Sequence, residues 1–134
     1  MNVHATLVLE VIAGNFAISK TCAKERGCPS HHEGEFLAVI NEGSVRTHIG
    51  PAFSSPPESI SRSENWRALR IRGPLPLCDA GILAPVLAVI ANAGASVIVV
   101  SSFDTDTVLV QDVAFADVLQ ALQIAGHQVL QEYP

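Results

Sequence analysis

The stretch from Ala95 to Gln111 constrains the fold most, because two short apolar runs flank a small polar segment there. The runs, Val97–Val100 and Val108–Val110, consist mostly of β-branched residues, which is typical of buried strands. The segment between them carries the hydroxyl and carboxylate side chains of a tight turn. The pattern predicts a β-hairpin. Its turn either satisfies its own backbone or presents two carboxylates, Asp104 and Asp106, to a ligand.

A helix is predicted on each side of this hairpin. Apolar residues recur at helical spacings from Ile82 to Ile90, with Asp79 as a candidate N-cap and Gly94 as the expected end. A second amphipathic pattern follows Asp112 and stops at Gly126. The hairpin therefore connects two helical segments.

Strands are predicted at both ends of this half of the chain. Trp66–Arg72 alternates aliphatic residues with Arg70 and Arg72, the pattern of a strand covered on one face, and His127–Glu132 alternates again. The order β-α-β-β-α-β predicts an α+β, ferredoxin-like fold with two helices on one face of a four-stranded antiparallel sheet. An RNA-recognition module of this fold would carry aromatic residues on its central strands, and the hairpin strands carry none.

The first half of the chain is predicted to be mostly β-structure. Thr6–Ala13 and Phe16–Lys20 are expected to form one hairpin around the pair Gly14-Asn15, and Glu35–Ile40 and Ser44–Ile49 a second one. The residues from 21 to 34 read as a polar loop or a poor helix.

A boundary between the halves is expected within Gly50–Glu64, because this segment holds three prolines and five serines and hardly any aliphatic residue. We therefore expect one unit over residues 1–62 and another over residues 63–134.

Composition limits the kind of partner and compartment. The chain has 134 residues, of which 49% are hydrophobic, and a net charge of -5, which does not favour nucleic acid as a partner. No membrane association is expected, because the N-terminus lacks a signal-peptide pattern and the most apolar region is interrupted by Pro85, Asn92 and Gly94. Three cysteines, an odd number, argue against a disulfide framework and favour the cytoplasm.

Three segments together resemble a known family: W-R-A-L-R-I-R-G-P-L-P-L-C-D-A-G-I-L-A-P, then V-V-S-S-F-D-T-D-T-V-L-V, then A-G-H-Q-V. They are similar to ACT-type amino-acid-sensing modules. The nearest likeness is to small bacterial tandem-ACT proteins, which resemble the regulatory domains of aspartate kinases and the Castor-type arginine sensors. The segments G-N-F-A-I-S and F-L-A-V-I extend the likeness over the first half, as an incomplete ACT-like unit.

The resemblance implies a non-catalytic regulatory or sensor protein without a cofactor. It implies a homodimer and a small ligand, an amino acid, held between paired ACT units; which enzyme it regulates is not indicated. Carried over position by position, it assigns the ligand site to the residues before the first helix and in the hairpin turn, namely Asp79, Gly81, Ile82, Ser102, Phe103 and Asp106.

Each assignment has a simpler alternative. Asp79 is also a candidate helix cap, Asp106 a candidate turn residue, and Phe103 either part of the core or of a pocket wall. The whole chain could instead be an interaction module without a ligand. A further alternative is a metal site formed by Cys22, Cys28, His31 and His32, although their spacing is not that of ordinary zinc modules.

Overall fold

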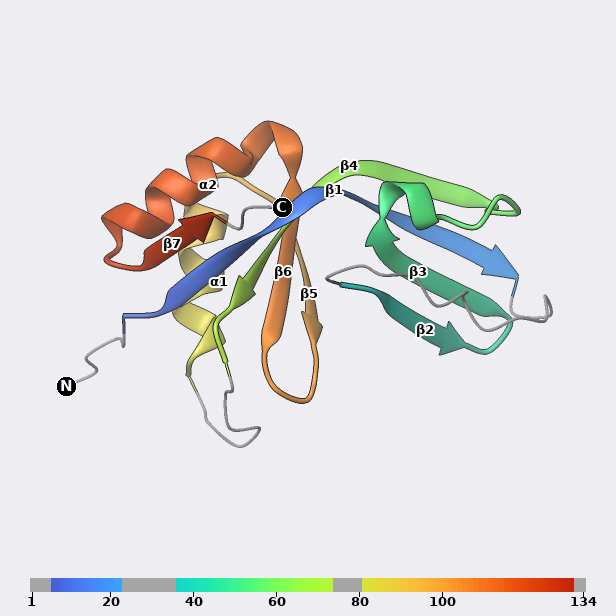
Figure 1. Cartoon of the computed structure of the whole chain (residues 1–134), viewed down its shortest axis with the longest axis horizontal. Helices are drawn as coiled ribbons and strands as arrows, with labels where there is room; N and C mark the ends of the chain where they lie inside the picture. The colour runs from blue at the N-terminus through green and yellow to red at the C-terminus, as the bar shows by residue number, and fades with distance from the viewer. Residues whose placement is uncertain (1–5, 23–35, 74–80, 132–134) are drawn as a thin grey trace. The chain divides into compact units, whose positions relative to one another are not determined.

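The structure is a computed structural model of the chain that describes residues 6–22, 36–73 and 81–131 (Figure 1). The chain divides into two units. Unit 1 comprises Met1–Ala13 and Arg67–Pro134, and unit 2 comprises Gly14–Trp66. The elements, in chain order, are β1 (Val8–Cys22), β2 (Ala38–Glu42), β3 (Val45–Pro51), the short 3-10 helix η1 (Ala52–Ser54), β4 (Ser61–Ile71), α1 (Leu83–Asn92), β5 (Val97–Ser101), β6 (Asp106–Gln111), α2 (Asp112–Ile124) and β7 (Gln128–Gln131).

β1 is one long strand whose first residues belong to unit 1 and whose last residues belong to unit 2. The predicted hairpin around Gly14-Asn15 is wrong: β1 pairs with β7 over Val8–Val11 and with β3 over Phe16–Cys22, without reversing direction between them. Gly14 takes a φ of 100°. Glycine adopts positive φ readily, so the strand can change its local conformation here. The same property had favoured a turn at this position in the sequence.

β4 shows a similar local change where it passes from unit 2 to unit 1. Asn65 has a φ of 66° and is the non-glycine residue with positive φ in the described part of the chain. Asparagine tolerates this left-handed conformation better than most residues. Trp66 follows it, is buried, and donates from Nε1 to Ser63 Oγ at 2.9 Å.

In unit 1 the strands follow the order β7-β1-β4-β6-β5. The predicted β-α-β-β-α-β order is present, and the fold is the expected mixed α/β, ferredoxin-like one. The expected four-stranded sheet is wrong in one respect, because β1 lies between β7 and β4. β7 pairs with β1 in parallel. Sequence periodicity identifies strands but does not state which neighbours they take, so this insertion was not predicted.

Both helices of unit 1 pack on one face of its sheet (Figure 1). α1 lies against β5 and α2, whereas α2 also lies against β6 and β7. The core between helices and sheet is aliphatic apart from Phe115, and its members are Leu9, Val11, Leu69, Ile71, Val86, Ile90, Val108, Val110, Phe115, Val118 and Leu122. Arg67 contacts the aromatic member of this core, because its guanidinium carbon lies 4.3 Å from the centre of the Phe115 ring. The same side chain forms an ion pair with Asp112 at 3.3 Å.

The helix ends follow the sequence signals closely. Gly94, with a φ of 82°, directly follows the C-cap of α1, and the amide of Ala95 donates to the carbonyl of Ile90. Gly126 plays the same part after α2. Pro85 is tolerated because α1 begins at Leu83, which places the proline in the first turn. None of the helices in the described residues is long and apolar enough to cross a membrane.

Unit 2 contains the strands β2, β3 and the adjoining parts of β1 and β4, in the order β2-β3-β1-β4. The second predicted hairpin is confirmed, with Glu42 paired to Val45 and Gly43 in the turn at a φ of 59°. The turn lies slightly later than predicted.

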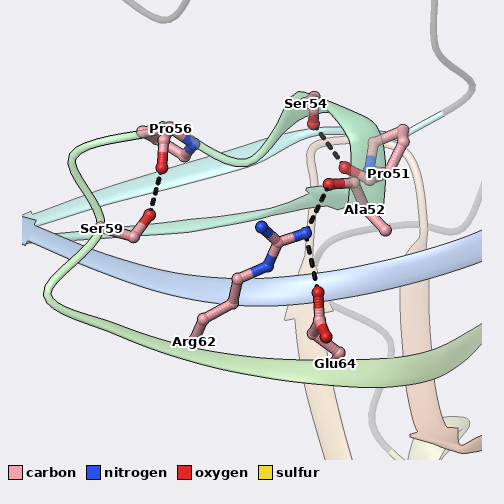
Figure 2. Close-up of polar contacts among 7 residues, drawn as sticks. All are labelled: Pro51, Ala52, Ser54, Pro56, Ser59, Arg62 and Glu64. Atoms are coloured by element: carbon pink, nitrogen blue, oxygen red, sulfur yellow. Dashed lines mark hydrogen bonds and ion pairs between the residues drawn. The ribbon is translucent and has the colours of Figure 1, made fainter.

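The segment between β3 and β4 is ordered by its own side chains, so the expected linker is wrong for much of Gly50–Glu64. Figure 2 shows Arg62 donating to the carbonyl of Ala52 at 2.9 Å while it pairs with Glu64. The hydroxyls of Ser54 and Ser59 each bond a proline carbonyl three residues earlier. The serines and prolines form local turns here rather than a linker.

Candidate functional site

The β5–β6 hairpin forms as predicted and carries three of the residues assigned to the ligand site. Ser101 pairs with Asp106, which leaves Ser102–Thr105 as the connection. The amide and the hydroxyl of Ser102 both donate to the carbonyl of Thr105, at 2.8 and 2.9 Å. Ser102 therefore stabilises the turn, which is the self-satisfied alternative for this residue.

Thr105 ties the hairpin to the end of β4. Its hydroxyl donates to the carbonyl of Ile71, which is the last residue of that strand. The hairpin connection thus lies beside the end of β4 (Figure 1). Sequence reasoning missed this residue, because a threonine in a turn indicates local hydrogen bonding and not a partner on another strand.

The two carboxylates of the hairpin take different positions. Asp106 is the first residue of β6 and alternates with Val108 and Val110, whose side chains belong to the core under the helices. Its carboxylate therefore lies on the helix-covered face of the sheet, half-buried. Asp104 lies exposed in the connection. The two carboxylates therefore belong to different elements, Asp106 to β6 and Asp104 to the connection.

The carboxylate of Asp106 has no hydrogen-bond or ion-pair partner within residues 6–22, 36–73 and 81–131. A turn-holding aspartate would bond nearby backbone amides, and in this hairpin Ser102 and Thr105 supply those bonds instead. A half-buried carboxylate without such partners can accept hydrogen bonds from a ligand.

The start of α1 supplies the opposite kind of group. Gly81 is exposed with a φ of 80°, and a side chain there would meet nothing within 4 Å. Ile82 occupies the N-cap position, and its apolar side chain makes no capping hydrogen bond to the first turn. The first amides of a helix lack partners within it and favour an anion. Pro85 has no amide hydrogen, so the available donors come from the residues just before it.

Phe103 does not join the core. Its side chain is 78% exposed at the tip of the hairpin, so the core alternative is wrong and the pocket-wall alternative stays a prediction. An exposed phenylalanine at a loop tip offers an apolar surface to a bound molecule.

Asp79, Cys28, His31 and His32 fall outside the described residues. Ile82 occupies the N-cap position of α1, and the expected role of Asp79 stays a prediction. Cys22 is half-buried with a free thiol. Within the described part of the chain, His, Cys, Asp and Glu side chains do not gather into a group that could hold a metal ion.

A comparison with family models finds one similarity. The model described as ACT domain matches residues 61–123, which include β4, α1, the hairpin and most of α2. This part of the chain, slightly less than half of it, is similar to an ACT domain. No curated protein matches the sequence at a significant level.

Solved structures agree with this fold. Protein Atu0741 from Agobacterium tumefaciens is 22% identical, with a TM-score of 0.85 over 97% of this chain and 96% of that one. The aspartate kinase of Clostridium acetobutylicum is 10% identical, with a TM-score of 0.64 over 90% of this chain and 35% of the enzyme. The regulatory subunit of the Thermus thermophilus aspartate kinase is 12% identical, with a TM-score of 0.54 over 86% and 99% of the two chains. At these identities the likeness is one of fold.

Proposed function

We propose that this protein is a non-catalytic regulatory or sensor protein whose ACT domain binds a small amino acid. The observation that carries the proposal is a half-buried carboxylate, Asp106, that has no partner among the described residues and follows Thr105, which bonds the end of β4. The ACT-domain match over residues 61–123 and the fold likeness to a regulatory subunit of an aspartate kinase support it.

A free α-amino acid presents an ammonium and a carboxylate a few ångströms apart. In this proposal the amides at Gly81 and Ile82 receive the carboxylate, because the start of a helix favours negative charge and glycine allows close approach. Asp106, with Asp79, takes the ammonium or a basic side chain, and Phe103 supplies an apolar wall. Ser102 contributes by shaping the turn. A second ACT unit completes the site.

The proposal also includes self-association as a homodimer and a cytoplasmic location. The stretch from Gly81 to Phe103, which contains no charged residue, supports the first, because interface centres are depleted of charge, and the odd number of cysteines supports the second.

A thermal-shift screen of the tag-free protein against the common amino acids tests the proposal. A ligand at a hundred times its dissociation constant adds about 2.7 kcal/mol to the free energy of unfolding. We expect one amino acid or a related group to raise the melting temperature in a dose-dependent way. No shift with any of them would instead support an interaction module without a ligand.

A further inference from the structure

One face of the sheet in unit 2 is buried and polar. Ser19, Thr21 and His48 lie on the paired strands β1 and β3 and are 1%, 4% and 4% exposed. The core of unit 1 is instead filled by aliphatic side chains and Phe115. Burial of polar groups costs free energy unless they are hydrogen-bonded, so a polar face of this kind indicates that its groups have something to bind.

The strand register brings these side chains together with Arg46. Ser19 lies opposite His48, and Thr21 lies opposite Arg46, in the ladder between β1 and β3. Side chains two residues apart in a strand share a face, and cross-strand partners are neighbours on it. The four side chains therefore form one patch, which we call the polar face of unit 2.

The segment after β3 lies over part of the polar face. Gly50 continues the alternation of Arg46 and His48 along β3. A β-carbon at Gly50 would lie 3.2 Å from both His48 Cε1 and Ser54 Oγ, so Ser54 is on the same side of the sheet as the imidazole. The next residue, Ser55, has a buried hydroxyl. The polar character of the face thus continues into this segment.

Two of these hydroxyls have no hydrogen-bond partner among the described residues. They are Ser19 Oγ and Ser55 Oγ, and both atoms are buried. Ser54 differs, because its hydroxyl donates to the carbonyl of Pro51 at 2.7 Å. A buried hydroxyl without a partner costs a folded protein free energy, and such groups in native structures usually bond a water or a ligand. Ser19, at 1% exposure, is the clearest case in the polar face.

The charge on the polar face is positive. Arg46 Nε donates to Asn41 Oδ1 at 2.8 Å, and Asn41 is the cross-strand partner of Arg46 on β2. This bond positions the guanidinium at the border of the face. The glutamates that the structure describes in unit 2, Glu42, Glu58 and Glu64, are exposed, so no described carboxylate of this unit is buried. Hydroxyls, an imidazole and a guanidinium are donors suited to an oxyanion.

We propose that the polar face of unit 2 binds a small oxyanion, that is, a carboxylate or a phosphoryl group. Ser19 and Thr21 donate their hydroxyl hydrogens to its oxygens. One ring nitrogen of His48 donates a further bond, and Arg46 supplies the charge. The site lies before the family-model match, which begins at residue 61. It shares no residue with the amino-acid site proposed in unit 1, so it stands independently of that proposal.

Titration of the isotope-labelled full chain with sodium phosphate and, separately, with sodium acetate tests the proposal by NMR, with sodium chloride at the same ionic strength as the reference. We expect saturable shifts of the Ser19 and Thr21 amides with at least one of the two probes. Shifts with phosphate alone would identify a phosphoryl ligand, and shifts with acetate alone a carboxylate. Saturable shifts with neither probe, or the same shifts with chloride, would overturn the proposal.

Two matched pairs of variants assign the binding to this face. Lys20 and Thr47 are cross-strand partners that alternate with the polar face and so lie on the other side of the sheet. We expect Arg46→Gln to raise the dissociation constant of the probe at least about tenfold and Thr21→Val at least about threefold. Lys20→Gln and Thr47→Val should leave it unchanged. Equal effects within either pair would place the binding elsewhere and contradict the proposal.

Ser19→Ala separates binding from a structural role. Because the hydroxyl has no partner within the described part of the chain, its removal should leave the urea midpoint of the ligand-free protein unchanged or higher. The same variant should bind the probe at least about threefold more weakly. A lower midpoint together with unchanged binding would mean that Ser19 serves the fold alone, against the proposal.

Discussion

At the scale of single residues, two backbone conformations carry a testable cost. Gly14 in β1 and Asn65 in β4 have positive φ, and each lies close to the boundary between the two units. A side chain at Gly14 would have open space, so any penalty comes from the backbone alone. The left-handed region costs non-glycine residues about 1–2 kcal/mol.

We therefore expect Gly14→Ala to lower the free energy of unfolding by about 1–2 kcal/mol, measured by urea denaturation. Asn65→Gly should leave stability unchanged or raise it, because it relieves the same kind of cost. Asn15→Ala is the control, since Asn15 is an exposed neighbour in the same strand. A fully stable Gly14→Ala variant would show that the positive φ at this position carries no cost for a side chain.

His127 holds the start of β1 in unit 1. Its Nδ1 accepts the amide of Leu7 at 3.2 Å, and the imidazole is 8% exposed. In His127→Ala this partly buried amide loses its partner, so we expect a loss of about 1–3 kcal/mol in the free energy of unfolding. Gln128→Ala, at the exposed neighbouring position, should cost much less. Equal losses in both variants would show that the imidazole acceptor is not what stabilises this junction.

At the scale of elements, Thr105 joins the hairpin to β4, and its replacement isolates that contribution. Thr105→Val keeps the shape of the side chain and removes the hydroxyl that bonds the Ile71 carbonyl. We expect a loss of about 1–3 kcal/mol in the free energy of unfolding and faster amide exchange in the hairpin. Ser102→Ala removes only an exposed bond within the turn and should change less. Unchanged exchange in Thr105→Val would mean that the hairpin holds its position without β4.

The elements differ in how far the sequence predicted them. Both helices, with their ends at Gly94 and Gly126, and both the β5–β6 and β2–β3 hairpins were predicted, because caps, turns and hydrophobic periodicity are local signals. The insertion of β1 between β7 and β4 was not, because strand partners far apart in sequence leave no local pattern. The pair of glycine and asparagine resembled a hairpin turn, although in β1 the glycine has a positive φ within one continuous strand.

The candidate site was predicted to a similar extent. The motif placed Asp106, Ser102 and Phe103 in one hairpin, which the structure describes, and strand alternation puts Asp106 on the helix-covered face. The role of Thr105 depends on a partner on another strand and was missed. The ligand contacts themselves stay predictions, and those of Asp79 lie outside the described residues.

At the scale of the whole molecule, the proposed ligand site belongs to unit 1, which contains α1 and the β5–β6 hairpin. A regulatory module, as proposed above, needs both a ligand and a surface that transmits its binding, because coupling is a free energy between two sites.

The central claim is that the carboxylate of Asp106 binds the ligand, and isothermal titration calorimetry of the amino acid found in the screen tests it most directly. The matched variants are Asp106→Ala and Asp104→Ala, which remove the same group two residues apart. Loss of a charged partner should cost about 2–5 kcal/mol of binding free energy. We expect Asp106→Ala to lose measurable binding while it still unfolds cooperatively, and Asp104→Ala to bind nearly normally. Normal binding by Asp106→Ala together with loss in Asp104→Ala would contradict the account.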